Sequence, residues 1–336
     1  MWLGIAISVF FVWFVLRDVD FRAVGGLILE ADWLVLIGLS VPSYVWANDL
    51  RARRWRHFTR PIASIGYGPH FRAISVGLMV NNVLPLRIGE IVRAWYLGRE
   101  SDTRVASLLG TVALERIIDV LTILSLAAVV LMVWGARGEG ALAQGALLLA
   151  PVAMGPAVGL AWLRIAPGQV HRALAWVLRP FPPRISQAAR NLLEQLEAGL
   201  GSLHAGSHLF WIGVDSVLIW AVASTLPFLA GFAALGIELG SWSETLVAAW
   251  AVLVAVALAV ALPAAPGFFG IYHAAAKWAL IRFGVTAKTA VAFGTLVHSV
   301  MWVTVILIGV LVLRRRGTSL RALRQMTDVG EPPRSE

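Results

Sequence analysis

Long apolar runs are the feature that most limits what this chain can fold into. A helix that crosses a membrane needs roughly 20 predominantly apolar residues. Runs of this kind recur along the 336 residues, at about 1–16, 33–49, 105–134, 141–163, 208–235 and 287–313. Only 14% of the residues are charged, whereas a soluble domain carries about 25%. The sequence therefore predicts an all-α polytopic membrane protein and excludes a soluble fold.

Two further apolar runs, 70–100 and 245–283, are interrupted by proline and glycine. Each contains a Leu-Pro pair, and proline removes a backbone donor and breaks the helix. A broken helix inside a membrane is tolerated only where protein or a water-filled cavity covers it. We predict that both runs are re-entrant helical hairpins beside a functional site. The residues expected to shape or gate these turns are Pro85, Gly89, Pro263, Pro266, Gly267 and Gly270.

The charges between the apolar runs predict an orientation. A basic cluster follows the second run and should be cytoplasmic by the positive-inside rule; it consists of Arg51, Arg53, Arg54, Arg56 and Arg60. The acidic segment 17–32 reads as an external loop, and Arg314 to Arg316 should face inward. With the N-terminus also inside, six full spans and two re-entrant hairpins satisfy these constraints. We read Met1 to Leu16 as a retained first span of a cell-membrane protein.

The chain is expected to form one transmembrane domain, 1–316, followed by a polar tail, 317–336. Segment 164–207 is basic, and its apolar residues between Ile185 and Leu203 recur along one side. This pattern is typical of an amphipathic helix on the cytoplasmic surface, although a solvated linker fits equally well.

An internal repeat is predicted between the halves 33–134 and 208–313. A shift that places Lys288 on Arg104 also aligns Ala290, Gly294 and Thr295 with Ala106, Gly110 and Thr111. The topology above makes the two halves inverted with respect to the bilayer. Inverted repeats with discontinuous helices that meet near the midplane are a common transporter plan.

Charged and polar side chains concentrate between residues 81 and 119, within otherwise apolar sequence. Each charge at the bilayer centre costs about 2.5–3.5 kcal/mol on insertion scales. These charged side chains must therefore pair with one another or serve a function. Spacings of three and four residues place several of these side chains on shared helix faces. The candidate substrate-binding residues are Asn81, Asn82, Arg87, Glu90, Arg93, Glu115, Arg116 and Asp119.

These residues fit two compatible interpretations. They could form a buried ion-pair network that locks the first hairpin to the third span. Alternatively, Arg87, Arg93 and Arg116 exceed what Glu90 neutralises locally, and the arginine fork matches phosphate oxygens. From the second hairpin, His273 and His298, together with Lys277, could complete such a site.

The composition excludes several other chemistries. Without cysteine, the chain has no disulfide, thiolate metal site or cysteine nucleophile. The net charge of +9 comes from arginines at the ends of apolar runs, which suits anionic lipid rather than nucleic acid. We find no nucleotide-binding motif and predict no cofactor, metal or catalytic residue.

The run from Asn82 to Arg93 (NVLPLRIGEIVR), followed by ERIID at Glu115 to Asp119, resembles the lysylphosphatidylglycerol synthase transmembrane-domain family, also described as flippase-like. That family's second motif has paired glycines after a proline, and Ala264 and Ala265 stand there in this chain. The resemblance implies translocation or modification of membrane lipid. The family's soluble synthase domain does not follow Arg316, so lysyl transfer is not expected.

Three functions remain open at this point. The first is transport of an anionic phospholipid or polyprenyl-phosphate-linked lipid between leaflets, proton-coupled or facilitated. The second is a membrane transferase acting on a polyprenyl-phosphate or phospholipid substrate, for which Asp18 and Asp20 superficially match an acidic motif. The third is a non-catalytic partner of a separate lipid-modifying enzyme.

Overall fold

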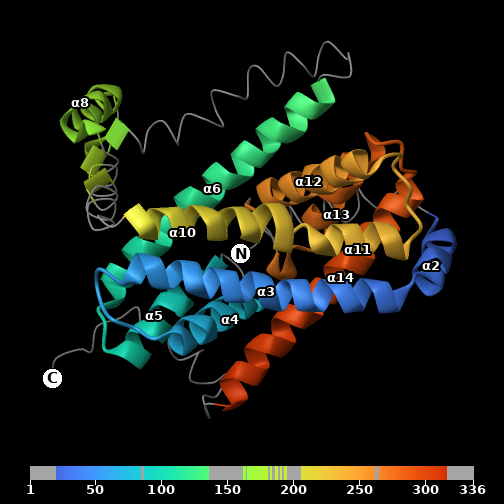
Figure 1. Ribbon diagram of the computed structural model, residues 1–336, viewed down its shortest axis with the longest axis horizontal. Coiled ribbons are helices and arrows are strands. Elements are labelled where there is room, and N and C mark those ends of the chain that lie inside the picture. The colour runs from blue at the N-terminus through green and yellow to red at the C-terminus, as the bar shows by residue number, and fades with distance from the viewer. Residues whose placement is uncertain are drawn as a thin grey trace.

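The computed structural model describes residues 20–84, 87–135, 162–163, 165–180, 182–183, 186–187, 190, 193–194, 206–261 and 265–315. This part of the chain contains helices and no strands (Figure 1). The elements are α2 (Phe21–Glu30), α3 (Trp33–Thr59), α4 (Tyr67–Val83), α5 (Gly89–Ser101), α6 (Val105–Gly135), α8 (Pro167–Val177), α10 (Gly206–Val217), η2 (Leu218–Ala223), α11 (Leu226–Ala234), α12 (Trp242–Ala259), η3 (Pro266–Phe268), α13 (Ile271–Ile281) and α14 (Ala287–Arg315).

Four stretches among the described residues are long and apolar enough to cross a membrane. They are Val105–Val133, Phe210–Ala234, Trp242–Ala259 and Ala287–Arg315. A fifth is the pair α2 and α3, which bend by 75° at their junction, if the pair counts as one span. The predicted multi-pass helical membrane protein is confirmed, whereas the number of six spans and the inverted repeat stay predictions.

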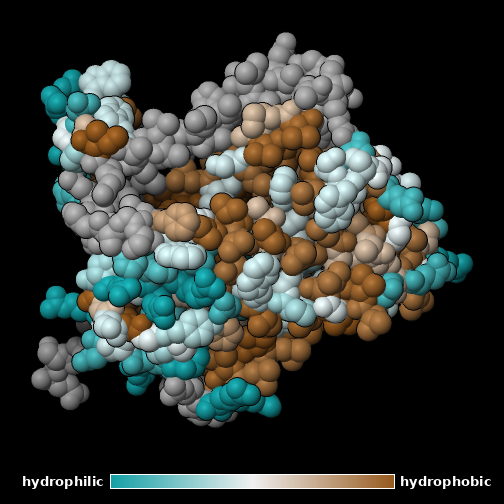
Figure 2. Space-filling view, viewed as in Figure 1, coloured by the Kyte–Doolittle hydropathy of each residue, from teal (hydrophilic) through white to brown (hydrophobic). Residues whose placement is uncertain are grey.

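The surface agrees with a membrane setting. Large apolar side chains remain exposed along the long helices, among them Leu39 on α3, Val129 on α6 and Leu307 on α14. Figure 2 shows apolar side chains over the middle of one face and polar ones toward the end where α4 and α5 lie. Such a belt suits contact with lipid tails, because lipid replaces water as the solvent there.

The interior divides into two main apolar cores. One core contains α11, α12 and α13 with the first half of α14. The other contains α4 and α5, the second half of α3, the first part of α6 and the second half of α14. Helix α14 therefore joins the two halves of the protein, and it packs against both α4 and α13.

Two element boundaries predicted from the sequence were wrong. The apolar run 33–49 continues as helix α3 to Thr59, so the basic cluster lies on the helix and at its C-cap, Arg60, rather than in a loop. Hydropathy ended the span at the first arginines because it cannot detect partners elsewhere in the fold. Within 17–32, residues 21–30 form helix α2, whose first turn is capped by the Asp20 carboxylate through Arg22 N (2.9 Å) and Ala23 N (3.3 Å).

Several predictions fall outside the described residues. These include the first span 1–16, nearly all of the run 141–163, most of the proposed amphipathic helix, and the tail 317–336. Pro85 and Pro263, the prolines of the two Leu-Pro pairs, also lie outside them.

Candidate functional site

The first hairpin meets the third predicted span through an arginine on α5. Arg93 Nη2 lies 2.7 Å from Glu90 Oε2, one helical turn earlier, and Arg93 Nη1 lies 3.0 Å from Glu115 Oε1 on α6. Arg93 and Glu115 are both buried. The spacing of three between Glu90 and Arg93 thus places both on one face, as predicted, and that face contacts the charged face of α6.

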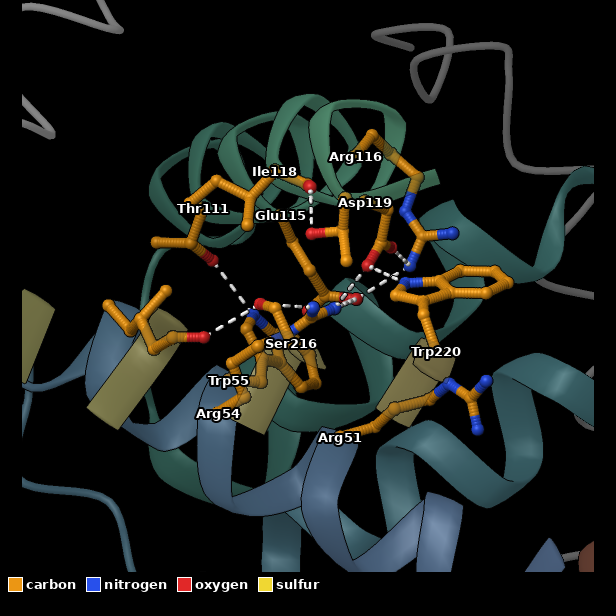
Figure 3. Close-up of polar contacts among 12 residues, drawn as sticks. Arg51, Arg54, Trp55, Thr111, Glu115, Arg116, Ile118, Asp119, Ser216 and Trp220 are labelled. Atoms are coloured by element: carbon orange, nitrogen blue, oxygen red, sulfur yellow. Dashed lines mark hydrogen bonds and ion pairs between the residues drawn. The ribbon is translucent and has the colours of Figure 1, made fainter. Parts of the chain in front are cut away.

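Arg116 on α6 contacts all three acids of the cluster. Its guanidinium lies 2.6 Å from Glu115 Oε1, 2.9 Å from Asp119 Oδ2 and 3.5 Å from Glu90 Oε1. The side chain of Arg116 is 41% exposed, unlike those of its partners Glu115 and Asp119. Arg116 is therefore the most exposed arginine of the cluster, and Figure 3 shows its guanidinium directed toward Asp119.

Arg54 completes the cluster from α3, and sequence reasoning missed it. It is fully buried, and its Nη2 lies 2.7 Å from Asp119 Oδ1 and 3.5 Å from Glu115 Oε1. Its Nη1 donates to Ser216 Oγ on α10 at 2.9 Å. The spacing signal was visible, because Arg51 and Arg54 are three residues apart on an apolar helix, but the positive-inside rule assigned both to the cytoplasm.

A short π-helix brings a tryptophan to the same cluster. In η2 the Ser224 N–H donates to Ile219 O, five residues earlier, at 2.8 Å. Trp220 lies within this wider turn and donates from Nε1 to Asp119 Oδ1 at 2.8 Å (Figure 3). The indole of Trp250 on α12 donates to Ala221 O at 3.1 Å. π-Turns inside helices are frequent at functional sites.

The cluster is balanced in charge. Three guanidinium groups (Arg54, Arg93, Arg116) face three carboxylates (Glu90, Glu115, Asp119). Of the three arginines in the predicted surplus of positive charge, Arg93 and Arg116 are neutralised within the cluster, because Glu115 and Asp119 pair with them. The predicted ion-pair network between hairpin and span is present in the structure, with α3 as a third contributor.

Helices α4 and α5 cross closely beside the cluster. A Cβ at Gly89 would collide with Gly77 O, and a Cβ at Gly77 would lie 2.8 Å from Arg93 Cβ. Asn81 Oδ1 accepts the Gly89 N–H at 2.8 Å. Asn81 thus caps the start of α5, while Asn82 only donates to Leu78 O in its own helix, at 2.9 Å.

Arg87 lies apart from the cluster. It precedes α5 with a positive φ of 54°, so it does not share the helical face of Glu90 and Arg93 as the sequence predicted. Among the described residues, no carboxylate lies within ion-pair distance of Arg87. Its guanidinium stands 5.6 Å from the ring centre of Phe268, in the second interrupted run. The two helix breaks therefore meet each other.

The second break has a tight turn and an aromatic lining. Pro266 opens η3, and Gly267 (φ 74°) and Gly270 (φ 86°) take left-handed conformations that favour glycine. The predicted polar residues His273 and His298 have ring centres 5.1 Å apart, beside Phe269, Tyr272 and Trp302. They belong to this aromatic group and do not contact the ion-pair cluster.

Two cavities meet at Arg51. A narrow cleft of about 10 Å³, room for one water molecule, is lined by Arg51, Asn81, Glu90, Arg93 and Arg116 together with Ile74, Gly77, Leu78 and Gly89. Arg51 also lines a larger chamber of about 160 Å³. The chamber is lined by Tyr44, Ala47, Arg51, Ala223, Ser224, Pro227, Phe228, Leu253, Tyr272, Val297 and Met301.

Arg51 has no acidic partner within ion-pair distance among the residues that the structure describes. It donates to Ser224 Oγ at a long 3.4 Å and stands 5.9 Å from the ring centre of Trp220. Its charge is therefore added to a cluster that is already neutral. In the described part of the chain, no group of three or more His, Asp or Glu side chains is placed so that it could hold a metal ion.

The helical fold and the buried charged site define a polytopic membrane protein with a polar site inside its apolar region. The chain belongs to the family described as the lysylphosphatidylglycerol synthase TM region, which it matches over residues 1–309. The resemblance noted in the sequence is thereby confirmed. The family's name sets the protein in a phospholipid-related membrane context.

One curated relative is the glycosyltransferase AglD of Haloferax volcanii, with 28% identity over 295 residues. The match covers 79% of this chain but only 46% of that protein, so this chain spans less than half the length of the relative. No solved structure matches the chain.

Proposed function

We propose that this protein is a flippase-like transporter that moves an anionic lipid, or a lipid-linked intermediate, between the leaflets of the cell membrane. The observation that carries the proposal is the position of Arg51. No carboxylate among the described residues lies within ion-pair distance of this arginine, and it lines both a charged cleft and a mainly apolar chamber. A ligand that fits both sides must be anionic at one end and apolar at the other.

The paired cluster supports phosphate binding at Arg51. Arg54, Arg93 and Arg116 are held by carboxylates, so an anion that arrives does not have to neutralise them. Arginine presents a planar fork of donors that binds phosphate oxygens in bidentate fashion. Arg116, which is 41% exposed and lines the same cleft, adds further donors. The headgroup phosphate would then lie between Arg51 and Arg116, with Asn81 beside it.

The contact between the two helix breaks supports movement of the headgroup. Discontinuous helices that meet inside a membrane are common at transporter sites. The Arg87 guanidinium contacts the Phe268 ring, which holds the two helix breaks together. The charged cleft has room for only one water molecule. We interpret this as a closed state, with Arg87 as a second phosphate contact when the breaks separate.

A membrane transferase is the second candidate, and the name of the relative AglD favours it. Against it, Asp20 of the proposed acidic motif caps helix α2 through two backbone N–H groups. The three acids of the cluster are each held by arginine. A non-catalytic partner of a lipid-modifying enzyme is the third candidate, and the family's name is compatible with it.

Reconstitution separates the three candidates. The full chain in proteoliposomes should move a fluorescent anionic phospholipid to the opposite leaflet, as measured by chemical quenching of the outer leaflet. Arg51→Met should slow this transport about tenfold or more, since a charge-assisted hydrogen bond contributes about 1.5–3 kcal/mol. Arg56→Met, on the exposed side of the same helix, is the matched control and should transport normally.

The other outcomes assign the other functions. If lipid distribution stays unchanged while purified protein transfers a sugar to a polyprenyl phosphate, the transporter proposal is wrong and the transferase stands. If neither activity appears until a lipid-modifying enzyme is added, the partner role replaces both.

A further inference from the structure

The chamber beyond Arg51 has mainly apolar walls. Its apolar lining comes from four helices, α3, α11, α12 and α14, and from η2; it includes Ala47, Ala223, Phe228, Leu253, Val297 and Met301. Most of these side chains are buried, with Val297 at 0% exposure and Ala223 at 1%. Apolar walls of this kind accept apolar groups. The chamber is therefore suited to hydrocarbon rather than to a hydrated headgroup.

The size of the chamber limits how much hydrocarbon it accepts. An apolar cavity of about 150 Å³ holds one benzene-sized molecule, and this chamber measures about 160 Å³. One hydrocarbon chain can place a short segment there, whereas two chains side by side cannot. Its walls belong largely to the buried cores, so widening it would require the packed helices to separate.

The position of Arg51 fixes which part of a lipid lies in the chamber. Arg51 lines both the chamber and the charged cleft, so the hydrocarbon next to it is the segment attached directly to the phosphate. In a diacyl phospholipid, a glycerol carrying two chains stands at that place. In a prenyl phosphate the single chain itself stands there, and in a lysophospholipid a glycerol carrying only one chain stands there.

We propose that the substrate is a single-chain lipid phosphate, with its phosphate at Arg51 and the first segment of its one chain in the chamber. The proposal rests on the proposed function, because it names the class of anionic lipid that the same site holds. Two sources share this chemistry: a prenyl phosphate, in which the chain is branched, and a lysophospholipid, in which it is straight.

Binding to the full chain in detergent tests the preference. Farnesyl phosphate and oleoyl lysophosphatidate, added as competitors of a fluorescent single-chain phosphate, should displace it. Farnesol lacks the phosphate, glycerol 3-phosphate lacks the chain, and dioleoyl phosphatidate has two chains; each should compete at least tenfold more weakly. If farnesyl phosphate competes better than oleoyl lysophosphatidate, the substrate is a prenyl phosphate; in the reverse case it is a lysophospholipid. Equal competition by dioleoyl phosphatidate would overturn the proposal.

Two substitutions on α14 test the location. Met301→Phe should fill the chamber and weaken binding of the single-chain phosphates at least tenfold. Val303→Phe, on the exposed side of the same helix, should leave binding unchanged. Unchanged binding by a folded Met301→Phe variant would place the chain elsewhere. If that variant does not fold, Leu253→Ala serves instead, because a wider chamber should reduce the preference for one chain over two at least threefold.

The outcomes also separate this proposal from the transport proposal. Tight binding of single-chain phosphates without movement of any lipid would support the proposed binding site and contradict the transport proposal. Transport of diacyl anionic lipids, with no competition by single-chain phosphates, would support the transport proposal and contradict the preference for a single-chain lipid phosphate.

Discussion

At the scale of single residues, the cluster shows how charged side chains are kept inside a membrane protein. Each charge near the bilayer centre costs a few kcal/mol, and burial removes it from water as well. The cost of burial is offset by ion pairing, because Arg54 lies 2.7–3.5 Å from Glu115 and Asp119. Removing one member of such a group leaves the others buried and uncompensated, which is strongly destabilising.

We predict that Arg54→Ala lowers the free energy of unfolding by about 3–5 kcal/mol, the typical loss for one partner of a buried ion pair. Unfolding in detergent, followed by heat or denaturant, measures the change. Arg56→Ala is the control, because Arg56 is exposed on the same helix and surface charges contribute about 0–1 kcal/mol. Equal losses in the two variants would mean that the cluster does not hold α3 in place.

We predict different effects for the two sides of the contact between Arg87 and Phe268. Arg87→Ala should reduce transport of anionic lipid, since it removes a phosphate contact. Phe268→Leu should keep the charge and loosen the closed state, since a cation–π contact contributes about 0.5–2 kcal/mol. Transport by Phe268→Leu should therefore be equal to or faster than that of the unmodified protein. A loss of the same size in both variants would show that the contact is purely structural.

Residue spacing predicted part of this site correctly. The separations of three between Glu90 and Arg93, and between Arg116 and Asp119, do place ion pairs on one helix face. Spacing could not predict Trp220, and the spacing of three between Arg51 and Arg54 could not show that the acidic partners of Arg54 lie on another helix far away in the sequence. It also misplaced Arg87, because a helix does not begin until Gly89.

At the scale of helices, glycine contacts and a π-turn place the side chains of the site. Gly77 and Gly89 allow the backbones of α4 and α5 to approach, as small residues commonly do between membrane helices. The π-turn Leu218–Ala223 places Trp220 on Asp119. The sequence indicated the two interrupted runs but not the π-turn, because no residue type marks it.

We predict that Gly89→Ala destabilises the pair α4 and α5, because the added Cβ would collide with Gly77 O. Gly38→Ala on α3 is the matched control, since nothing lies within 4 Å of a Cβ there. In a helix interior, alanine is favoured over glycine by about 0.5–1 kcal/mol, so Gly38→Ala should be neutral or slightly stabilising. Thermal unfolding in detergent compares the two, and an unaffected Gly89→Ala would contradict the close crossing.

At the scale of the whole molecule, α14 links the two cores and the site lies between them. The chamber takes Leu253, Tyr272 and Val297 from one half of the protein and Tyr44 and Arg51 from the other. Hydropathy predicted the helical membrane class and most long helices from the sequence. It could not predict which helices share a core, because long helices uniformly rich in apolar residues do not mark a packing face.

Orientation in the membrane is open to a direct test, because the chain has no native cysteine. We predict that Ser64→Cys, near the end of α3 and the basic cluster, reacts only from the cytoplasmic side. Ser243→Cys, at the opposite end beside the start of α12, should react only from outside. A membrane-impermeant thiol reagent on intact cells distinguishes them, and reversed labelling would invert the predicted topology.

We propose that Arg51 holds a lipid phosphate between the charged cleft and the apolar chamber. Photo-crosslinking tests it most directly, with a single-chain lipid phosphate that carries a diazirine on the carbons next to its phosphate. We expect adducts on Ser224, Phe228 or Met301 in the chamber, and we expect Arg51→Met to abolish them. Adducts confined to exposed residues such as Val303 and Leu307, unchanged by that substitution, would contradict it.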